Sequence, residues 1–516
     1  MTVLTSLVAE KWVAPSGTGR DVLDATTGGL VAVVSSEGIE SAAMLRHGRE
    51  VGGPALRSLT FAARAQLLQD LTRALGDGRD ELLELSTKSG ATKLDAKVDV
   101  DGGTGTMHVL AGMAAKAFPE AHHLVDGARS PLSRSGEFGA QHVLTPRRGV
   151  AVQINAYNFP VWGTLEKFAP AFLAGVPTIV KPATETAYIT HRLVELMVET
   201  GLLPEGSIQL VCGDARSLLD LLNGQDSLLF TGSAATAAKL RGHPAVVGRS
   251  VRFNGETDSL NAAILGPDAA VGSAELDLFV TEVVNEITTK AGQRCTCIRR
   301  ALVPEATRED VVEAVAAKLA DVVVGNPASS DTTMGALVSV GQRESVRQAV
   351  ESLVAGGARL RFGSLHGFEV HDADPEVGAF LPPLLLEADA DCQVVHEIEA
   401  FGPVTTVVGY DDLDHAGELA RRGGGSLVAS LFTADDSVAR EVVDAIGSHH
   451  GRLLVVNTSV ADEQTGHGTP MPQTIHGGPG RAGGGEELGG LRAVEHFLQR
   501  TAVQGSTALL DLLAAS

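Results

Sequence analysis

The sequence predicts an α/β protein built around parallel sheets, and three observations lead to this class. Short β-branched runs recur along the chain, helical segments alternate with them, and glycines lie mostly at the junctions. Such alternation is typical of parallel α/β sheets. Glycine accounts for 59 of the 516 residues, and tight turns between strand and helix explain this excess better than loose linkers do.

The predicted elements follow in order along the chain. Residues 57–85 place apolar side chains at i, i+3 and i+4, which predicts an amphipathic helix. GVAVQIN and GVPTIVK predict two strands around the apolar segment FPVWGTLEKFAPAFLAG, which reads as a helix. The next predicted strands of the parallel sheet are SIQLVCG, SLLFTG, SVRFNG and AAILG, with alanine-rich segments such as SAATAAKLRG between them.

A second α/β stretch follows a long helix. Residues 273–290 carry an apolar stripe from Leu276 to Ile287, Ser273 can cap this helix, and it ends before Gly292. The predicted strands from about residue 299 to residue 460 are ALVP, VVVG, TTVVGY, SLVASLFT and RLLVVN.

Charge and composition exclude several classes of protein. With 41 basic and 63 acidic residues the net charge is −22 and the pI is about 5.1, which argues against binding to nucleic acid or an anionic membrane. Apolar runs fall short of the ~18 residues that cross a bilayer, and the N-terminus lacks a basic segment followed by an apolar one. We therefore expect a cytoplasmic protein that binds any anionic ligand through local groups.

The four cysteines, at positions 212, 295, 297 and 392, are too few for a disulfide scaffold. Cys295 and Cys297 lie in KAGQRCTCIRR, a short turn that leads into a strand. An isolated buried cysteine is more often an inert packing residue than a nucleophile. A Cys-x-Cys pair without a second Cys/His cluster does not form a tetrahedral site, so we expect no metal.

Five stretches, in family order and at family spacing, resemble the aldehyde dehydrogenase superfamily over nearly the whole chain. They are INAYNFPVWGTLEKFAPAFLAG, IVKPATETA, FTGSAATAAKL, KAGQRCTCIRR and EIEAFGPV. The resemblance implies that Cys295 is the catalytic nucleophile and that Cys297 is a structural neighbour. It also implies that Asn158 and the backbone N–H of Cys295 stabilise the oxyanion that forms when the thiol attacks an aldehyde.

The general base departs from the common family pattern. Many members place a glutamate in an ELGGKSP-like turn, whereas this chain reads VRFNGETDSLNAAIL, and a rigid alignment puts Asn254 at that position. Asparagine cannot act as a carboxylate base, but Glu256 follows two residues later. ETDSLN and the stretch 465–505 resemble the CoA-thioester semialdehyde dehydrogenases of phenylacetate and benzoate ring cleavage, which implies that Glu256 activates water. An exposed turn glutamate is the alternative.

The resemblance also implies a cofactor site at FTGS. Gly232 and Ser233 precede a helix whose N-terminus can bind pyrophosphate. Lys181 matches the residue that reaches the adenosine ribose. At the position where NAD-preferring members often have a glutamate, this chain has Thr184, so we expect NADP, with NAD possible because Glu185 follows.

Two further segments bear on ligand binding. Glu399 and Phe401 of EIEAFGPV match the residues that hold the nicotinamide ribose and ring. Gly478, Gly480 and Gly483 spell G-x-G-x-x-G, but TPMPQTIH precedes this stretch where a dinucleotide fingerprint would have a strand. We therefore predict a glycine-rich loop near the substrate entrance.

The resemblance implies a three-part architecture. A Rossmann-type cofactor domain takes residues 1–130 and 151–255, an α/β catalytic domain takes 256–480, and a β oligomerisation arm takes 131–150 with 481–516. GEFGAQHVLTPRRGVAV alternates as a hairpin strand does and could extend a partner's sheet. We expect a homodimer or a tetramer.

The expected activity is NADP-dependent oxidation of a CoA-linked semialdehyde, such as 3,4-dehydroadipyl-CoA semialdehyde, to the carboxylic acid in aromatic-compound degradation. Three alternatives stay open: a general aliphatic or aromatic aldehyde dehydrogenase, an acylating enzyme that passes the thioester to CoA, and a catalytically silent binding partner. Glu256 argues against the acylating enzyme. The complete motifs at Asn158, Cys295 and Glu399 argue against the silent protein.

Overall fold

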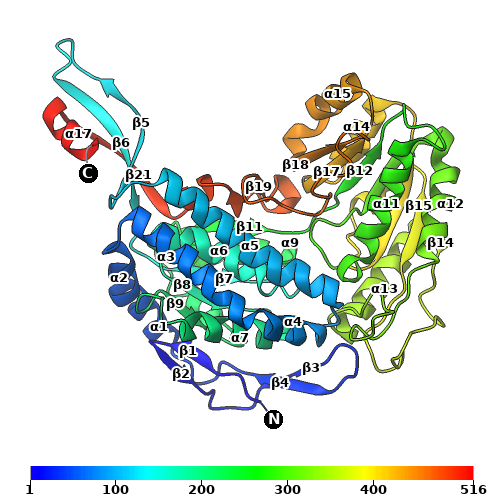
Figure 1. Ribbon diagram of the computed structural model, residues 1–516, viewed down its shortest axis with the longest axis horizontal. Helices are drawn as coiled ribbons and strands as arrows, with labels where there is room; N and C mark the ends of the chain where they lie inside the picture. The colour runs from blue at the N-terminus through cyan, green and yellow to red at the C-terminus, as the bar shows by residue number, and fades with distance from the viewer. Residues whose placement is uncertain (1, 515–516) are drawn as a thin grey trace.

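Two seven-stranded sheets organise the chain in the computed structural model, which describes residues 2–514 (Figure 1). The first sheet has the order β11-β10-β7-β8-β9-β1-β2, and its five central and edge strands β7 to β11 run parallel. Their bounds are β1 Ser6–Val8, β2 Lys11–Val13, β7 Ala151–Ile154, β8 Thr178–Lys181, β9 Ile208–Leu210, β10 Ser227–Thr231 and β11 Arg252–Glu256.

Helices cover the first sheet and bury a large apolar core between themselves and the strands. They are α1 Ser41–His47, α2 Gly53–Arg57, α3 Phe61–Ala74, α4 Arg79–Thr87, α5 Lys93–Ala117, α6 Trp162–Leu173, α7 Ala187–Glu199, α8 Arg216–Leu219, α9 Ala234–Arg241 and α10 Pro244–Gly248. A hairpin of β3 Arg20–Leu23 and β4 Leu30–Val34 lies beside them.

The prediction of a single helix over 57–85 is wrong in one respect, because this segment contains two separate helices, α3 and α4. A short 3-10 turn, Leu75–Gly78, lies between them. A Cβ on Gly78 would come within 2.4 Å of Leu196 on α7, so close packing of α7 requires glycine at this point. Glycine is a weak helix former, and the helix breaks there.

The second sheet has the order β14-β15-β16-β13-β12-β17-β18, and all its strands except β14 run parallel. Its strands are β12 Ala262–Leu265, β13 Arg300–Pro304, β14 Arg359–Phe362, β15 Leu384–Ala388, β16 Val404–Tyr410, β17 Ser426–Phe432 and β18 His450–Val456. The helices that pack on it are α11 Ala274–Thr288, α12 Arg308–Leu319, α13 Val340–Ala355, α14 Leu413–Arg421 and α15 Asp436–Ile446.

Two strand predictions need correction. AAILG does form a strand, β12, but it lies in the second sheet between β13 and β17. VVVG at 322–325 joins neither sheet, and Val324 makes only an isolated bridge to Met334. The backbone of this segment is satisfied locally, since Thr333 and Met334 donate to the carbonyl of Val323. By contrast, α11 and its Ser273 cap, which accepts from the backbone N–H of Leu276, confirm the helix predicted over 273–290.

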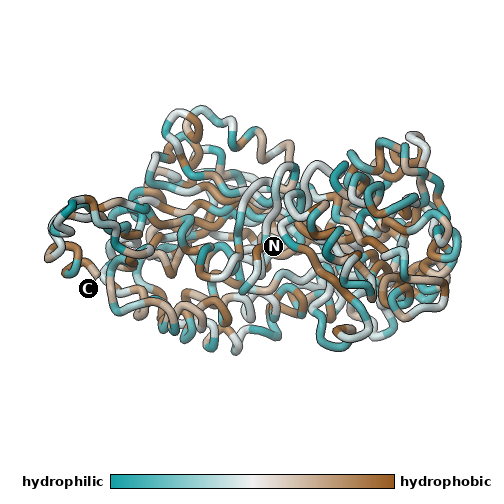
Figure 2. Tube along the Cα trace, turned by 90° about the horizontal axis from the view of Figure 1, so that it is seen from above, coloured by the Kyte–Doolittle hydropathy of each residue, from teal (hydrophilic) through white to brown (hydrophobic). Residues whose placement is uncertain are grey.

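A three-stranded arm projects from the body (Figure 1), and Figure 2 shows it from above at one end of the molecule together with the C-terminus. It consists of β5 Leu124–Pro131, β6 Phe138–Pro146 and β21 Leu498–Ser506 in the order β21-β6-β5, followed by α17 Thr507–Ala514. The C-terminal segment before it holds β19 Ile475–His476, β20 Leu488–Gly489 and α16 Arg492–Glu495. The predicted domain boundaries stay a prediction, although β5 begins ahead of residue 131 and the chain passes from the first sheet to the second after β11.

Across the described residues 2–514, we find no helix that combines the length and the apolar character needed to span a membrane.

Candidate active site

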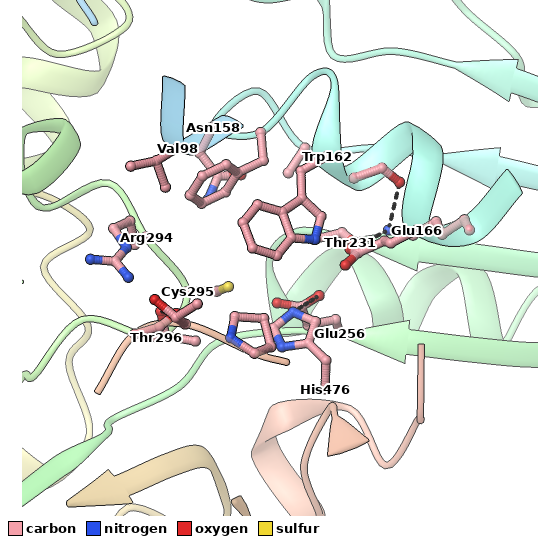
Figure 3. Close-up of a pocket in the computed structure, with 17 residues that line it drawn as sticks. Val98, Asn158, Trp162, Glu166, Thr231, Glu256, Arg294, Cys295, Thr296 and His476 are labelled. Atoms are coloured by element: carbon pink, nitrogen blue, oxygen red, sulfur yellow. Dashed lines mark hydrogen bonds and ion pairs between the residues drawn. The ribbon is translucent and has the colours of Figure 1, made fainter. Parts of the chain in front are cut away.

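Two adjoining cavities meet at Cys295. Both are lined by Asn158, Glu256 and Cys295, so the junction between them holds a nucleophile, a carboxylate and an amide (Figure 3). The first cavity is further lined by Val98, Phe159, Trp162, Glu166, Lys167, Arg294, Thr296, Gly468, Thr469, Pro470 and His476. The second is further lined by Tyr157, Gly232, Ser233, Thr257, Asp258, Gln342, Ser345, Val346, Glu399, Phe401 and Arg481.

The two sheets supply different parts of this junction. Glu256 ends β11 in the first sheet, and Asn158 follows β7 in the same sheet. Cys295 lies between α11 and β13 of the second sheet, and Glu399 and Phe401 precede β16 there. The site is therefore assembled at the seam between the two sheets.

A strained turn delivers the nucleophile. Lys290, Ala291 and Gly292 all have positive φ, at 52°, 50° and 67°. For the two residues that are not glycine this left-handed conformation is costly, and such strain persists only where surrounding contacts enforce it. Here the backbone N–H of Lys290 donates to Asp95 over 2.8 Å, and a guanidinium N–H of Arg299 donates to the Gly292 carbonyl over 2.9 Å.

Further hydrogen bonds fix the loop around Cys295. The amide of Asn261 donates to the carbonyls of Cys295 and Cys297, over 2.8 Å and 3.0 Å. The Thr296 hydroxyl donates to the Gly468 carbonyl over 2.9 Å. The Cys297 thiol donates to the backbone carbonyl of Glu286 over 3.0 Å, so Cys297 has the contacts of a structural residue.

Cys295 is a thiol at neutral pH. Burial raises the pKa of Cys295 well above its usual range, and the nearby carboxylate of Glu256 raises it further. Because thiolate is the attacking species, the thiol must lose its proton as it attacks. Sγ of Cys295 lies within 4.8 Å of a Glu256 carboxylate oxygen, so a proton acceptor is close by.

Glu256 is ionised and held by a histidine. Burial favours its neutral form, but His476 opposes this with its Nε2 at 3.1 Å from Oε2, and Lys167 adds to the effect, so the pKa of Glu256 falls to about 2. In return, although burial disfavours its charge, the carboxylate raises the pKa of His476. Within residues 2–514 the other carboxylate oxygen, Oε1, is buried without a hydrogen-bond partner, which leaves it able to accept a proton from a thiol or a water.

A buried cluster of charges lies behind the base. The Lys167 ammonium is 3.0 Å from Glu487 and 3.5 Å from Glu166. Burial raises the pKa of Glu487 well above its usual range, while the carboxylates around Lys167 outweigh its burial and raise the pKa of the lysine. Lys167 thus keeps its charge among the carboxylates that lie close to the base.

Asn158 is positioned by the start of α6. Asp99 on α5 accepts hydrogen bonds from the backbone N–H groups of Val161 and Trp162, over 3.3 Å and 2.8 Å. This carboxylate satisfies donors at the helix N-terminus. Lys290 lies over the ring of Phe159, 4.6 Å from its centroid, and holds the same turn from the other side.

Replacing Asn158 by alanine is expected to lower kcat by about 10²–10³-fold, because one preorganised donor to the oxyanion is lost. Stopped-flow measurement of reduced cofactor checks this. Affinity for the oxidised cofactor serves as the control, and it should change less than about threefold, since the amide acts on the aldehyde oxygen. A kcat within a factor of two of the wild type would remove Asn158 from this role.

Replacing His476 by glutamine is expected to raise the pKa of Glu256, since burial then meets less opposition. Activity at pH 4 should fall relative to activity at pH 8, because the acid limb of kcat, which follows the lowered pKa of Glu256 of about 2, should move upwards by roughly one to three pH units. The activity falls on the acid side because only the ionised carboxylate of Glu256 can act as the base. The lowered pKa of Glu256 contributes stability above about pH 4.5 that is lost towards pH 2. A pH profile parallel to the wild type would contradict the role of His476.

The second cavity suits an elongated anionic ligand. Gly232 and Ser233 stand at the N-terminus of α9, where Ser233 accepts from the backbone N–H of Thr236. Oε1 of Glu399 and Oγ1 of Thr231 are buried there without a hydrogen-bond partner in the described chain. Burial raises the pKa of Glu399 to about 7, against the opposing charge of Arg299. Unsatisfied polar atoms of this kind fit the hydroxyl groups of a ribose.

Lys181 and Thr184 lie apart from this cavity. They line a more open surface cavity together with Arg20 and Arg216, which stand near the β3–β4 hairpin and the start of α8. Arg20 reaches Glu185 over 3.4 Å. The structure therefore divides the predicted cofactor residues into two groups, one at the junction with Cys295 and one at this surface cavity.

Several site residues escaped sequence reasoning. His476, Lys167, Glu166 and Glu487 lie in stretches that resemble the family, but nothing in those stretches marks them as neighbours of Glu256, which they reach only through the fold. The glycine-rich loop was expected near the substrate entrance, but Arg481 of that loop lines the second cavity, and Ala482 accepts from the backbone N–H of Thr257 over 3.0 Å. The loop can pack this closely because Gly483 has no side chain. A Cβ at this position would come within 2.1 Å of the Gly255 carbonyl.

Comparison with known proteins agrees with this geometry. Residues 12–503 match the aldehyde dehydrogenase family. The 3,4-dehydroadipyl-CoA semialdehyde dehydrogenase of Aromatoleum evansii is 46% identical over 479 residues, covering 92% of this chain and 93% of that protein. A betaine aldehyde dehydrogenase of Vibrio vulnificus is 27% identical over 441 residues, covering 84% and 85% of the two chains.

Solved structures share the fold. A betaine aldehyde dehydrogenase of Staphylococcus aureus, crystallised with NAD+, superposes with a TM-score of 0.84 at 23% identity and covers 98% of this chain and 96% of that one. Lactaldehyde dehydrogenase of Escherichia coli gives the same TM-score of 0.84 at 23% identity, with coverage of 98% and 100%. The chain therefore belongs to the aldehyde dehydrogenase family of NAD(P)-dependent oxidoreductases.

Proposed function

We propose that this enzyme oxidises a CoA-linked semialdehyde, such as 3,4-dehydroadipyl-CoA semialdehyde, to its carboxylic acid in aromatic-compound degradation, with NADP as cofactor. The observation that carries the substrate is the 46% identity, over 92% of the chain, to a dehydrogenase named for that semialdehyde. The intact set of Asn158, Glu256 and Cys295 at one junction supports catalysis rather than a silent binding role.

The residues of this chain divide the chemistry between them. The Cys295 thiol attacks the aldehyde carbon and passes its proton to the carboxylate of Glu256. Asn158 donates a hydrogen bond to the developing oxyanion. When bound, the nicotinamide accepts the hydride that converts the adduct to a thioester. Glu256 then takes a proton from water, which attacks the thioester and releases the acid.

The charge cluster supports the hydrolytic outcome over transfer to CoA. Glu256 must lose the thiol's proton before it can activate water. Lys167 and Glu487 lie behind it as a buried ion pair of 3.0 Å. An enzyme that transferred its thioester to CoA would have no use for a base that activates water.

Preference for NADP is supported by the surface cavity. Lys181, Arg20 and Arg216 line it with Thr184, and these cations suit a 2′-phosphate. Replacing Thr184 by glutamate is expected to lower kcat/KM for NADP by about tenfold or more, since a carboxylate repels the phosphate, and to change that for NAD much less. Replacing Thr18 of the same cavity by serine is the matched control. An unchanged ratio between the two cofactors would count against this site.

A substrate panel tests the function directly. CoA-linked semialdehydes and plain aliphatic and aromatic aldehydes are assayed in parallel with NAD and NADP. We expect the highest kcat/KM for a CoA-linked semialdehyde with NADP. A tenfold or greater preference for plain aldehydes would remove the CoA-linked substrate and keep the family.

We also propose that the enzyme is cytoplasmic and forms a homodimer or a tetramer through the arm. The strand predicted to extend a partner's sheet is wrong, because it forms β6, which pairs with β21 on one side and β5 on the other. The edge strands β5 and β21 can instead pair with another chain. Leu132, Phe138, Leu509 and Leu512 are exposed apolar residues on the arm and α17. A monomer by light scattering at micromolar concentration would contradict the assembly.

A further inference from the structure

The second cavity contains an ion pair that the proposed reaction does not use. Nη2 of Arg481 lies 3.7 Å from Oδ2 of Asp258, and both residues line the cavity beside Gly232 and Ser233. Their side chains are about a quarter exposed, at 22% and 28%. Both side chains therefore face the space in which the cofactor binds.

Asp258 occupies the N-terminus of α9. Its Oδ1 accepts a hydrogen bond of 2.9 Å from the backbone N–H of Ala234, the first residue of that helix. The positive end of a helix dipole and a guanidinium thus converge on one carboxylate. A phosphate group can bind to the same two partners, the N-terminus of α9 and the guanidinium of Arg481.

The backbone beneath Arg481 is fixed, whereas its ion pair is long. Its N–H donates to the Gly424 carbonyl over 2.9 Å, and its carbonyl accepts from the Thr257 hydroxyl. A Cβ on Gly425 would come within 2.1 Å of the Pro479 carbonyl, so glycine at this position allows the close approach. The backbone of Arg481 is therefore held in place, while its guanidinium is free to exchange Asp258 for another anionic partner.

Arg481 is also the only lysine or arginine among the described residues that line this cavity, which holds the acidic Glu256, Asp258 and Glu399. A dinucleotide adds the negative charge of its pyrophosphate to these carboxylates. A cation is needed to offset that charge. Oε1 of Glu399 is buried without a hydrogen bond, 3.6 Å from Nε of Arg299, and so can accept a hydrogen bond from a polar ligand in the same cavity.

We propose that Arg481 binds the nicotinamide-side phosphate of the cofactor, and that Asp258 takes the place of this phosphate at Arg481 and α9 when no cofactor is bound. The assignment to the nicotinamide side follows from the cavity, which Arg481 shares with Glu399 and Phe401, whereas Lys181 and Thr184 line the other one. The inference rests on dinucleotide use by the proposed function and holds for NAD and NADP alike, because both carry the same pyrophosphate.

Calorimetric titration of the intact enzyme tests the two roles, which predict opposite effects. Arg481→Met should weaken binding of both NADP+ and NAD+ by about tenfold, and Arg481→Lys should weaken it less. Asp258→Asn keeps an acceptor for the Ala234 N–H but removes the competing charge, so both cofactors should bind about threefold more tightly or better. Adenosine 2′,5′-bisphosphate, which lacks the nicotinamide-side phosphate, should bind the Arg481→Met variant within a factor of two of the wild type.

Arg241→Met is the matched control. Arg241 anchors the same loop by donating to the Gly483 carbonyl over 2.7 Å, and it stacks on Phe253, but it does not line the cavity. Its loss should change cofactor affinity by less than twofold, which separates loosening of the loop from loss of the cation. Thermal melts confirm that each variant is folded.

Three results would overturn the proposal: unchanged cofactor affinity in Arg481→Met, an equal loss in Arg241→Met, or weaker binding in Asp258→Asn. Equal weakening for the bisphosphate would also refute it, since Arg481 would then act on the adenosine side. If the variants behave as expected but the enzyme prefers NAD over NADP, the NADP preference in the proposed function is wrong and the role of Arg481 stands. The two failures are therefore distinguishable.

Discussion

Replacing Glu256 by glutamine is expected to lower steady-state turnover by about 10³-fold and to leave a slowed burst of about one reduced cofactor per site, because the same carboxylate takes the proton of the Cys295 thiol and then that of water. Glutamine fills the same space but cannot take a proton from water, so the thioester on Cys295 accumulates. Stopped-flow absorbance gives the burst, and intact-protein mass spectrometry should find the acyl group on the enzyme.

Glu387→Gln is a matched control for this experiment. Glu387 is a buried glutamate on β15 that pairs with Arg308 over 3.1 Å and with Arg359 over 3.3 Å, away from both cavities. Its replacement should lower thermal stability and leave the kinetics without an enlarged burst. Wild-type turnover without a burst in Glu256→Gln would show that another group is the base.

Replacing Cys295 by alanine is expected to reduce formation of reduced cofactor by at least about 10⁴-fold, since no covalent adduct can form. Cofactor binding should persist, because Glu399, Phe401 and α9 are intact. Steady-state absorbance assays at high enzyme concentration measure the residual rate.

Cys297→Ala provides the comparison within the same loop. Its thiol donates to the Glu286 carbonyl, and Cys297 lines neither cavity, so it offers no second nucleophile. We expect activity within a few-fold of the wild type and a modest loss of stability. Substantial oxidation by Cys295→Ala that disappears only in the double variant would reassign the nucleophile.

Local patterns predicted the parts of the fold that local physics determines. The stripe from Leu276 to Ile287 predicted α11 together with its Ser273 cap, and SLLFTG followed by SAATAAKLRG predicted β10 and α9. The two glycines of LGDG at 75–78 could have indicated the break between α3 and α4, whereas the approach of Leu196 on α7 to Gly78 could not be predicted from local sequence. The sheet membership of β12 also depends on its neighbours, β13 and β17, and not on its own residues.

The candidate site divides in the same way. Cys295, Asn158 and Glu256 lie in recognisable sequence motifs, and the structure brings them to one junction. His476 lies 220 positions from Glu256 in the sequence, on a two-residue strand, and nothing in the stretch 465–505 marks it as a partner of a carboxylate. Whether such a histidine meets a carboxylate is decided by tertiary packing alone. The same holds for Asp258 and Arg481, whose pairing joins the end of β11 to the C-terminal loop.

The position of the site at a seam has a consequence for how the enzyme fails. Glu256 and Asn158 move with the first sheet, while Cys295, Glu399 and Phe401 move with the second. A slip of about 1 Å between two otherwise folded halves would cost reaction rate heavily, because reacting groups must be aligned closely. Partial opening of this kind requires far less free energy than global unfolding. The reaction rate should therefore respond to a displacement between the two halves before a spectroscopic measurement of secondary structure does.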